Sequence, residues 1–390
     1  MLLEEAPIAV DSFNHPGVEL GGPQIYFCSH AHEDHMKGLS KKWRKGRLFA
    51  SEITGRLLKL RWPALDITVL DLGKVHHINL DTGLEIQVYL IDANHVPGSV
   101  MFLFSGYFGS ILYTGDFRLH QKHAGIAELS MLRDKALSRI YLDNTYCDPR
   151  FRQPHREDVA KAILRRVKKK WPCIVFISSY KLGKECLLLH LAKQLRCPLM
   201  VSEERRHVFN KLNLDPSELT MVQIQASDPV KANEELLYRE SLRGCIWLVS
   251  RQNLRKAMCR ASESGVAAHG ILPTGWSEDV SKHFMPGFVD DDHCFVSDDG
   301  ICSFSYSDHC SYLELVQFLE FLPCVPVTFV TPLSEAEGPY NYVGATGLKQ
   351  LMQDTGIPSV RHCRKGEKMD MLKNHLAPKR PVEAAENGGG

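Results

Sequence analysis

One short run of ligand-type side chains constrains this chain more than any other feature. Residues 30–35 read His-Ala-His-Glu-Asp-His, and histidine and carboxylate groups are the ligands that zinc-like ions prefer. His30 and His32 are two residues apart, so on an extended segment both side chains project to one side and can share an ion. Asp34 and His35 follow, where a turn into a helix would let them face a second ion.

Two ions about 3.5–4 Å apart suit in-line displacement at phosphorus. The run therefore predicts a two-metal hydrolase that acts on phosphodiester bonds. A polar loop of histidines that binds no metal is the alternative interpretation of the run alone.

Two coordination shells need more ligands than one run supplies. His95 lies in a Pro-Gly turn after an apolar stretch, Asp116 ends another apolar stretch, and His309 closes the segment Ser305–His309. Ligands on strand-end loops of a rigid sheet are typical of functional sites. Each residue also has a structural alternative: a turn cap for His95, a loop acid for Asp116 and a buried, hydrogen-bonded histidine for His309.

Composition excludes several classes of protein. The formal net charge is +1, so contact with nucleic acid must come from local patches. The 12 cysteines include no Cys-x-x-Cys pair, which argues against a zinc ribbon. The N-terminus lacks the features of a signal peptide, and the longest apolar runs are too short to span a membrane. We expect no membrane contact and a reducing, intracellular location.

The texture of the sequence changes near residue 150. Before it, short apolar or β-branched stretches predict strands. Residues 155–171 predict a helix because Val159, Ile163 and Val167 recur every four positions. A buried strand is expected at Cys173–Ile177, and strand texture returns around Cys302–His309. The strands expected in the first part are Ile8–Asp11, Ile25–Ser29, Thr68–Leu72, Glu85–Ile91, Val100–Phe104, Ile111–Thr114 and Arg139–Leu142.

At this point the residues resemble a known family. Asp11, the run His30–His35, His95 and Asp116 resemble, in order and setting, the four motifs of the metallo-β-lactamase fold. Asp143 and His309 resemble two further motifs of the β-CASP subgroup, which processes nucleic acids. The resemblance covers roughly residues 6–330, is strongest before residue 150 and is poor over 196–295. The chain is thus identified as similar to the Artemis/Apollo group of DNA nucleases.

The resemblance implies an α/β fold, a metallo-β-lactamase αββα sandwich with an inserted β-CASP α/β domain. We expect the sandwich at residues 1–147 and 301–376, the insertion at 148–300 and a disordered tail at 377–390.

The resemblance also implies the metal ligands. The expected cofactor is zinc at one or two sites, and another divalent metal such as Mg or Mn is the alternative at the second site. The first ion would be held by His30, His32 and His95, and the second by Asp34, His35 and His309, with Asp116 bridging the two.

Two carboxylates are expected beside the metals rather than on them. Asp11 would accept the second ring N–H of a ligand histidine and fix its tautomer. Asp143 would orient His309 in the same way, with a plain strand-end cap as the alternative. The residues expected to carry catalysis are Asp34, His35, Asp116, Asp143 and His309.

DNA is the expected substrate. RNA-processing members of the subgroup place a histidine at the end of the strand after the His309 motif, whereas this chain offers Val330 in the expected strand Val325–Thr331. The resemblance implies a nuclear 5′-to-3′ exonuclease that acts on 5′-phosphorylated single-stranded or duplex ends. Repair of interstrand crosslinks and telomere-end processing are family expectations. We recognise no segment that would dock a telomere protein, and we expect a monomer.

The chain end must also be recognised. The segment Ser179–Glu185 joins a strand to a helix, where backbone N–H groups attract phosphate and a glycine allows close approach. A helix start with its lysine in solvent is the alternative. The residues expected to bind the 5′-phosphate are Tyr180, Gly183, Lys184 and Ser307.

Two basic clusters are candidates for contact with the DNA backbone, although most charge runs are solvated surface. One cluster is Lys41–Arg47, which contains Trp43. The other is Arg165, Arg166, Lys168, Lys169 and Lys170.

Three other functions remain open. The first is an RNA-processing endonuclease of the same subgroup. The second is a small-molecule metallohydrolase such as a thioesterase, because the fold hosts many reactions. The third is an interaction module that has lost its metal ligands. A ligand-type residue at every expected position argues against this alternative.

Overall fold

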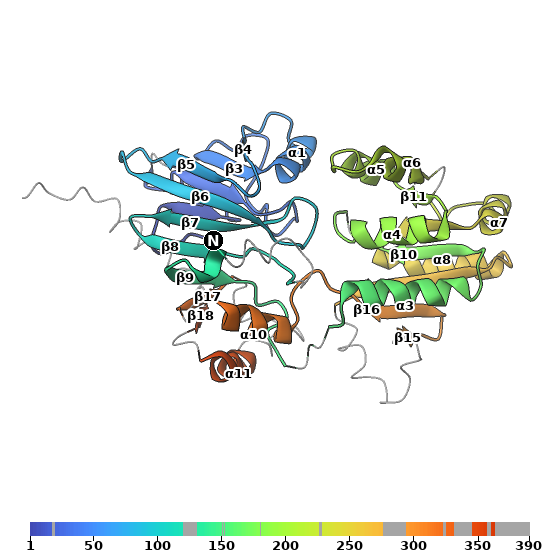
Figure 1. Ribbon diagram of the computed structural model, residues 1–390. Coiled ribbons are helices and arrows are strands. Elements are labelled where there is room, and N and C mark those ends of the chain that lie inside the picture. The colour runs from blue at the N-terminus through green and yellow to red at the C-terminus, as the bar shows by residue number, and fades with distance from the viewer. Residues whose placement is uncertain are drawn as a thin grey trace, which may run out of the picture.

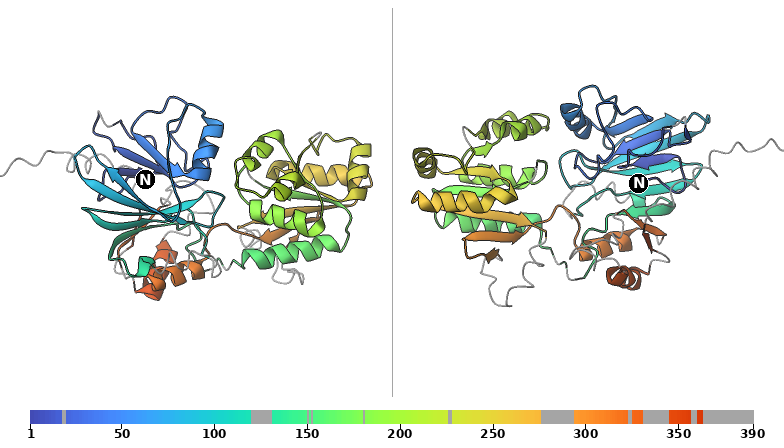
Figure 2. Two further views of the ribbon diagram at one scale, coloured as in Figure 1. Left: turned by 45° about the horizontal axis from the view of Figure 1, so that its top comes forward. Right: turned by 180° about the vertical axis from the view of Figure 1, so that it is seen from behind.

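The polypeptide folds into two lobes joined by two connections (Figures 1 and 2). The computed structural model describes residues 1–17, 20–119, 131–149, 151, 153–179, 181–225, 228–275, 294–322, 325–330, 345–356 and 360–362. The expected tail at 377–390 lies outside these residues. No helix among them is long and apolar enough to cross a membrane. The cysteines within them are free thiols.

The first lobe contains two stacked sheets. The smaller sheet is parallel throughout, in the order β1 (Ile8–Val10), β2 (Ile25–Cys28), β3 (Arg47–Ser51) and β4 (Thr68–Leu70). The larger sheet has the order β18 (Val360–His362), β17 (Val327–Phe329), β9 (Leu137–Leu142), β8 (Gly109–Tyr113), β7 (Val100–Gly106), β6 (Glu85–Asp92) and β5 (Val75–Asn79). It is antiparallel from β5 to β8 and parallel from β8 to β18.

Alternation along β2 divides its side chains between two cores. Ile25 and Phe27 pack between the two sheets, whereas Tyr26 and Cys28 pack on the opposite face. The ring of Phe27 lies 4.9–5.1 Å from those of Phe49, Phe102 and Phe104, which belong to both sheets. Truncation of such a buried phenylalanine costs about 3–5 kcal/mol. The strand that leads into the His30–His35 run is therefore firmly anchored.

Helices cover the outer faces of both sheets. Helix α1 (Glu52–Arg61) packs on the smaller sheet, and α10 (Tyr312–Phe321) and α11 (Ala345–Thr355) lie beside the larger one (Figure 1). The four layers are helix, sheet, sheet and helix, which confirms the predicted metallo-β-lactamase sandwich.

The second lobe is a seven-stranded sheet with helices on both faces. The strand order is β12 (Val222–Ile224), β11 (Leu199–Val201), β13 (Cys245–Val249), β10 (Ile174–Ser178), β14 (Ala268–Thr274), β16 (Ile301–Ser305) and β15 (Cys294–Val296), parallel except for the β15–β16 pair. The helices are α3 (Arg156–Lys168), α4 (Glu185–Leu195), α5 (Glu203–Phe209), α6 (Pro216–Met221), α7 (Glu234–Arg243) and α8 (Arg251–Glu263).

The structure moves one predicted boundary. The sequence placed the return to the first lobe at residue 301, but β16 pairs with β14 through Ser305 and completes the second sheet. The chain therefore returns after Ser305. Because this strand ends beside a candidate ligand motif, the sequence interpretation assigned it to the first lobe.

Six elements described in the first lobe were not expected from the sequence: β3, α1, β5, α10, α11 and β18. Helix α1 begins at Ser51, whose side chain accepts a hydrogen bond from the Thr54 amide. The helix is short and begins directly after β3. The sequence around it is typical of strands, so the helix was not recognised. Helix α3 ends at Lys168, slightly before the predicted end, because Pro172 disfavours helical backbone at the residue before it.

Candidate metal centre

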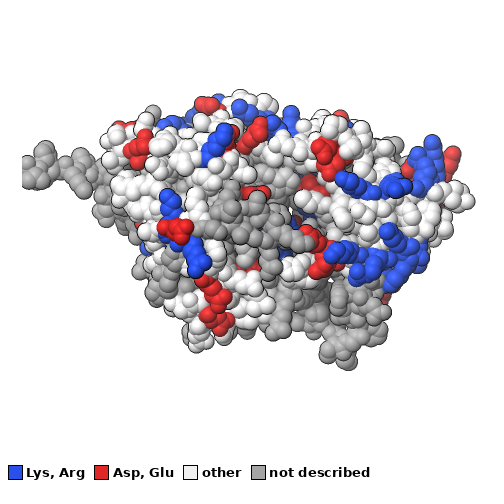
Figure 3. All heavy atoms as spheres, in the orientation of Figure 1, with Lys and Arg blue, Asp and Glu red and all other residues white. Residues whose placement is uncertain are grey.

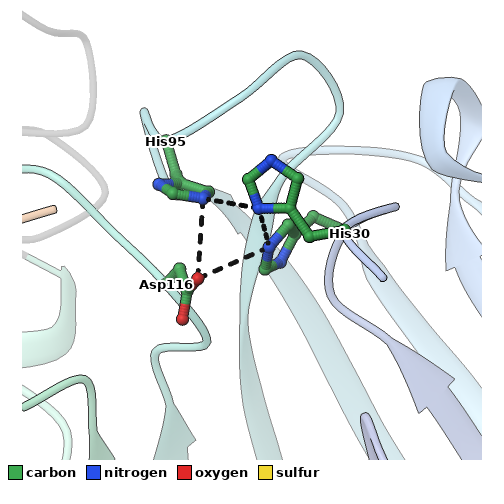
Figure 4. A group of neighbouring side chains, drawn as sticks. His30, His95 and Asp116 are labelled. Atoms are coloured by element: carbon green, nitrogen blue, oxygen red, sulfur yellow. Dashed lines mark hydrogen bonds and ion pairs between the residues drawn. The ribbon is translucent and has the colours of Figure 1, made fainter. Parts of the chain in front are cut away.

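Four side chains from strand-end loops of the first lobe converge on one point. His30 and His32 follow β2, His95 follows β6 and Asp116 follows β8. The Nε2 atom of His30 lies 3.0 Å from Nδ1 of His32, and Nε2 of His95 lies 3.2 Å from the same nitrogen. Oδ2 of Asp116 lies 3.5 Å from Nε2 of both His30 and His95. Figure 4 shows His30, His95 and Asp116 turned toward one another.

The spacing fits a tetrahedral metal site. Zinc–nitrogen bonds of about 2.0–2.1 Å place the ligand atoms of a tetrahedron about 3.3–3.4 Å apart. The four distances given above for this cluster, 3.0–3.5 Å, bracket that value. Three histidines and one carboxylate are also the donor set that zinc prefers.

Hydrogen bonds outside the cluster fix the histidine tautomers. A carbonyl oxygen only accepts, so Nδ1–H of His95 donates to Asp308 O at 2.8 Å and Nε2–H of His32 donates to Leu182 O at 3.3 Å. The remaining ring nitrogen of each is unprotonated and faces the cluster. Such mutually facing lone pairs repel one another unless a cation lies between them.

The carboxylate of Asp11 orients two histidines. It accepts from the Ser29 hydroxyl at 2.6 Å and from Nδ1–H of His35 at 2.9 Å. Because the Ser29 hydroxyl proton is used in this way, Ser29 Oγ accepts from Nδ1–H of His30 at 3.0 Å. Asp11 lies outside the ligand cluster, in the position that the sequence interpretation gave it.

A second set of side chains also faces the carboxylate of Asp116. Nε2 of His35 lies 3.2 Å from Oδ1 of Asp116, and Nε2 of His309 lies 3.9 Å from Oδ2. Nδ1 of His309 lies 2.8 Å from Oδ2 of Asp143, which directs Nε2 toward Asp116. Asp116, Asp143 and His309 also form a compact ligand group by distance.

Asp34 lies at the rim of this second set. Its carboxylate is 3.6 Å from Nε2 of His35, and its side chain is 64% exposed. Residues 33–38 form turns rather than the helix that the sequence suggested. Asp34 reaches the second set by this turn, from the solvent side.

The two sets of histidines differ in charge. Burial lowers the pKa of His30, His32 and His95, so these side chains are neutral near pH 7. Burial acts in the same direction on His35, but Asp116 and Asp11 outweigh it and raise its pKa well above the ordinary value. Asp143 and Asp116 likewise raise the pKa of His309 to about 9 despite its burial.

A buried arginine that the sequence did not single out holds the loop of His309. Arg118 is 3% exposed, and its guanidinium pairs with Glu314 at 3.0 Å. Nη1 donates to the carbonyl oxygens of Ser307 and His309, and Nη2 donates to Pro154 O. Both connections between the lobes therefore meet at Arg118. The residue stands two positions after Asp116, but its burial left no mark in the sequence.

A cleft of about 560 Å³ opens beside the metal ligands, between the two lobes. It is lined by His32, His95 and His309 from the metal centre and by Gly183, Lys184 and Ser307 among the residues expected to bind phosphate. Tyr180 lies outside the described residues. Thr145 and Tyr146 also line the cleft, and the Tyr146 ring lies 5.9 Å from that of His309.

Two of the expected phosphate contacts are already used within the protein. The Ser307 hydroxyl accepts from the His309 amide at 2.9 Å and contacts His309 O at 3.1 Å, so it shapes the ligand loop. The Gly183 amide donates to the buried carboxylate of Glu185. Lys184 is the cationic member of the set, and it lines the cleft beside Ser307.

The basic clusters occupy different settings. Trp43 is 5% exposed and packs edge-on against Phe13 and Tyr26, so its ring is part of the core rather than of the basic surface. Lys and Arg side chains gather over α3 on the second lobe (Figure 3). Arg165, Lys168, Lys169 and Lys170 are exposed there.

Comparison with known proteins identifies relatives of the chain. No family model matches it. It is 34% identical over 339 residues to the 5′ exonuclease Apollo of Gallus gallus, covering 83% of this chain and 62% of that protein. The Mus musculus Apollo is 34% identical, over 86% of this chain and 56% of its own length. The DNA cross-link repair protein SNM1 of Arabidopsis thaliana is 31% identical, over 82% and 63%.

The fold has a more distant counterpart. A protein of unknown function from Enterococcus faecalis V583 superposes with a TM-score of 0.54 at 12% identity, over 91% of this chain and 85% of that one. This likeness concerns the fold alone.

The sandwich and its histidine–aspartate cluster define a protein of the metallo-β-lactamase class with a capacity to bind metal. Within that class, the chain belongs to the SNM1/Apollo/Artemis-like β-CASP family. It spans about three fifths of the length of the curated relatives it matches.

Because the two histidine sets differ in charge, we expect metal binding at each set to release a different number of protons. At pH 7, zinc binding at the first set should displace few protons, because His30, His32 and His95 are neutral. Binding at the second set should displace about two protons, one each from His35 and His309, and should tighten as pH rises toward about 9. Calorimetric titration of the metal-free protein in two buffers of different ionisation enthalpy measures this. Equal proton release in both steps would contradict the assignment.

Gly115 is predicted to be essential for the approach of Asp116 to His30. Its φ is +54°, and a Cβ atom there would lie 3.0 Å from both Cβ and Oγ of Ser29. Gly115→Ala should cost about 1 kcal/mol in backbone strain and weaken zinc binding about 10-fold by displacing Ser29. Gly83→Ala is the matched control, because Gly83 has φ +80° with no atom within 4 Å of the added carbon. Unfolding curves and zinc affinity should separate strain, shared by both variants, from the loss of zinc.

Proposed function

We propose that this protein is a metal-dependent DNA nuclease that removes nucleotides in the 5′-to-3′ direction from 5′-phosphorylated ends. The observation that carries the proposal is the placement of Asp116 between two histidine sets, three members of which, His32, His95 and His309, line a cleft that also contains Lys184. The relatives' names support it, since they include a 5′ exonuclease and DNA cross-link repair proteins. Two of these names support a role in DNA cross-link repair. A nuclear location and telomere-end processing are proposed from the family resemblance alone.

The proposed residues divide the work. His30, His32 and His95 would hold a first ion, and Asp34, His35 and His309 a second, with Asp116 shared. We propose zinc for the first site and zinc, magnesium or manganese for the second. When bound, such ions would make hydroxide available as a nucleophile near neutral pH and stabilise charge on the phosphate.

Hydrogen bonds to the outer ring nitrogens would keep the ligand histidines in place. Asp11, through Ser29 and His35, and Asp143, through His309, would hold each imidazole in the tautomer that leaves a lone pair for the ion. None of these carboxylates needs to act as a nucleophile. Removal of Asp116 would take a shared ligand from both proposed sites, because its carboxylate faces His30 and His95 of one set and His35 and His309 of the other.

Asp116→Asn is expected to lower nuclease activity at least 1,000-fold, on the order of the loss seen when a major charge-stabilising group is removed. Digestion of matched single-stranded DNA and RNA of one sequence by wild-type protein and variant measures it. Retained activity in the variant would overturn the two-metal proposal. Faster cleavage of RNA than of DNA would favour the alternative of an RNA-processing endonuclease.

Lys184→Gln is expected to raise KM for a 5′-phosphorylated oligonucleotide about 10-fold, because a charge-assisted contact to the terminal phosphate is lost. KM for the same oligonucleotide with a 5′-hydroxyl should change little. Lys256→Gln is the control, since Lys256 is an exposed lysine of α8 that does not line the cleft. An equal loss on both substrates would remove Lys184 from end recognition.

A further inference from the structure

A loop of the second lobe lies against the metal centre. Residues 181–184 connect β10 to α4 and line the same cleft as His32 and His95. The Leu182 carbonyl accepts a hydrogen bond from Nε2–H of His32 at 3.3 Å. A Cβ atom on Gly183 would lie 3.9 Å from that same nitrogen. The position of this loop therefore affects a candidate metal ligand on the other lobe.

One buried guanidinium holds the loop from behind. Arg205, on α5, is 5% exposed. Its Nη1 donates to Lys181 O, and its Nη2 donates to Gly183 O at 2.9 Å. The carbonyls on either side of Leu182 are thus tied to Arg205, while the carbonyl between them is left for His32.

A buried carboxylate completes the attachment. Glu185 is 2% exposed and accepts from Nη2 of Arg205 at 2.6 Å and from the Gly183 amide at 2.9 and 3.1 Å. Loss of one partner of a buried ion pair leaves an uncompensated charge, so the pair resists rearrangement. Three backbone groups of the loop are fixed by these two side chains.

The attachment also supports an unfavourable backbone conformation. Lys184 has φ +64° and ψ +14°, the left-handed region that a residue with a Cβ atom seldom adopts. In this conformation its Nζ lies 5.9 Å from the centre of the Tyr306 ring, at the cleft. Without the fixed carbonyls on its N-terminal side, the chain would relax and move the ammonium group.

We propose that Arg205, paired with Glu185, is a positioning residue that couples the second lobe to the metal centre. It holds residues 181–184 so that the Leu182 carbonyl fixes the tautomer of His32 and Lys184 projects into the cleft. The part concerning Lys184 rests on the proposed function, whereas the part concerning His32 does not.

Arg205→Lys tests this coupling in the full chain. Lysine keeps the charge opposite Glu185 but presents a compact ammonium group, which cannot reproduce the planar fork that grips two carbonyls and a carboxylate. Arg206→Lys is the matched control. Arg206 is the neighbouring residue and donates from Nη1 to Leu219 O at 2.7 Å and to Val222 O, away from the cleft.

Two measurements are made on both variants. Competition with a chelator should show one zinc equivalent bound about 10-fold more weakly in Arg205→Lys and unchanged in Arg206→Lys. The ratio of kcat/KM for 5′-phosphorylated over 5′-hydroxyl DNA should also fall about 10-fold in Arg205→Lys alone. Thermal unfolding confirms that each variant is folded. If Arg205→Lys does not fold, Glu185→Gln is measured in its place.

The outcomes separate the two proposals. Zinc binding in Arg205→Lys equal to that in Arg206→Lys would overturn the coupling to His32. A wild-type protein indifferent to the 5′ group would overturn end recognition, while the zinc measurement would still decide the role of Arg205. A drop in zinc affinity with an unchanged 5′-phosphate ratio would confine Arg205 to the metal centre and refute its action through Lys184.

Discussion

The carboxylate of Asp116 is the group on which the rest of the site depends. Its Oδ2 faces His30 and His95 at 3.5 Å, and its Oδ1 faces His35 at 3.2 Å. Burial opposes the charge of this carboxylate, yet His35 and His309 hold its pKa well below the ordinary value. A charge kept in so enclosed a place is stable only with cations around it. The protonated histidines of the second set supply that compensation in the metal-free protein, and metal ions would replace it.

Backbone geometry brings the ligand loops close enough to share one carboxylate. Asp11, Asn94 and Gly115 all have φ between +51° and +54°, and each lies in a loop that follows a strand of the first lobe. Asp and Asn tolerate this region better than most residues, and glycine adopts it freely. The sharp turns redirect the chain at the sheet edge, so that groups from β1, β2, β6 and β8 meet there. Lys184, on the second lobe, adopts the same region without such a tolerance, which makes its support by Arg205 necessary.

The sequence predicted the sandwich and the strand-end settings of the candidate ligands, because these depend on residue type and spacing. The pairing of His30 with His32 follows from alternation along an extended chain. Several hydrogen-bond partners of the site could not be predicted from the sequence. Leu182 and Asp308 contribute main-chain carbonyls, for which any residue type would serve, and no pattern of side chains marks them. Arg118 and Arg205 were missed because burial of a guanidinium depends on tertiary contacts, and the stretch 196–295 matched the family poorly. The boundary at 301 was wrong because β16 carries no signal of which sheet it joins.

The hydrogen-bond acceptors of two ligand histidines show why the lobes must act together. His32 relies on a carbonyl of the second lobe, and His95 relies on one from the returning connection. Arg118 holds that connection through the carbonyls of Ser307 and His309. Arg156 of α3 holds it as well, because it donates to Asp308 at 3.0 Å and to Asn94 of the first lobe. A sandwich without the second lobe would keep its ligand side chains but lose these two acceptors, and with them the preference for one tautomer. The geometry of the cleft and that of the metal centre are therefore coupled. A shift of the second lobe that altered the width of the cleft would also alter the orientation of His32.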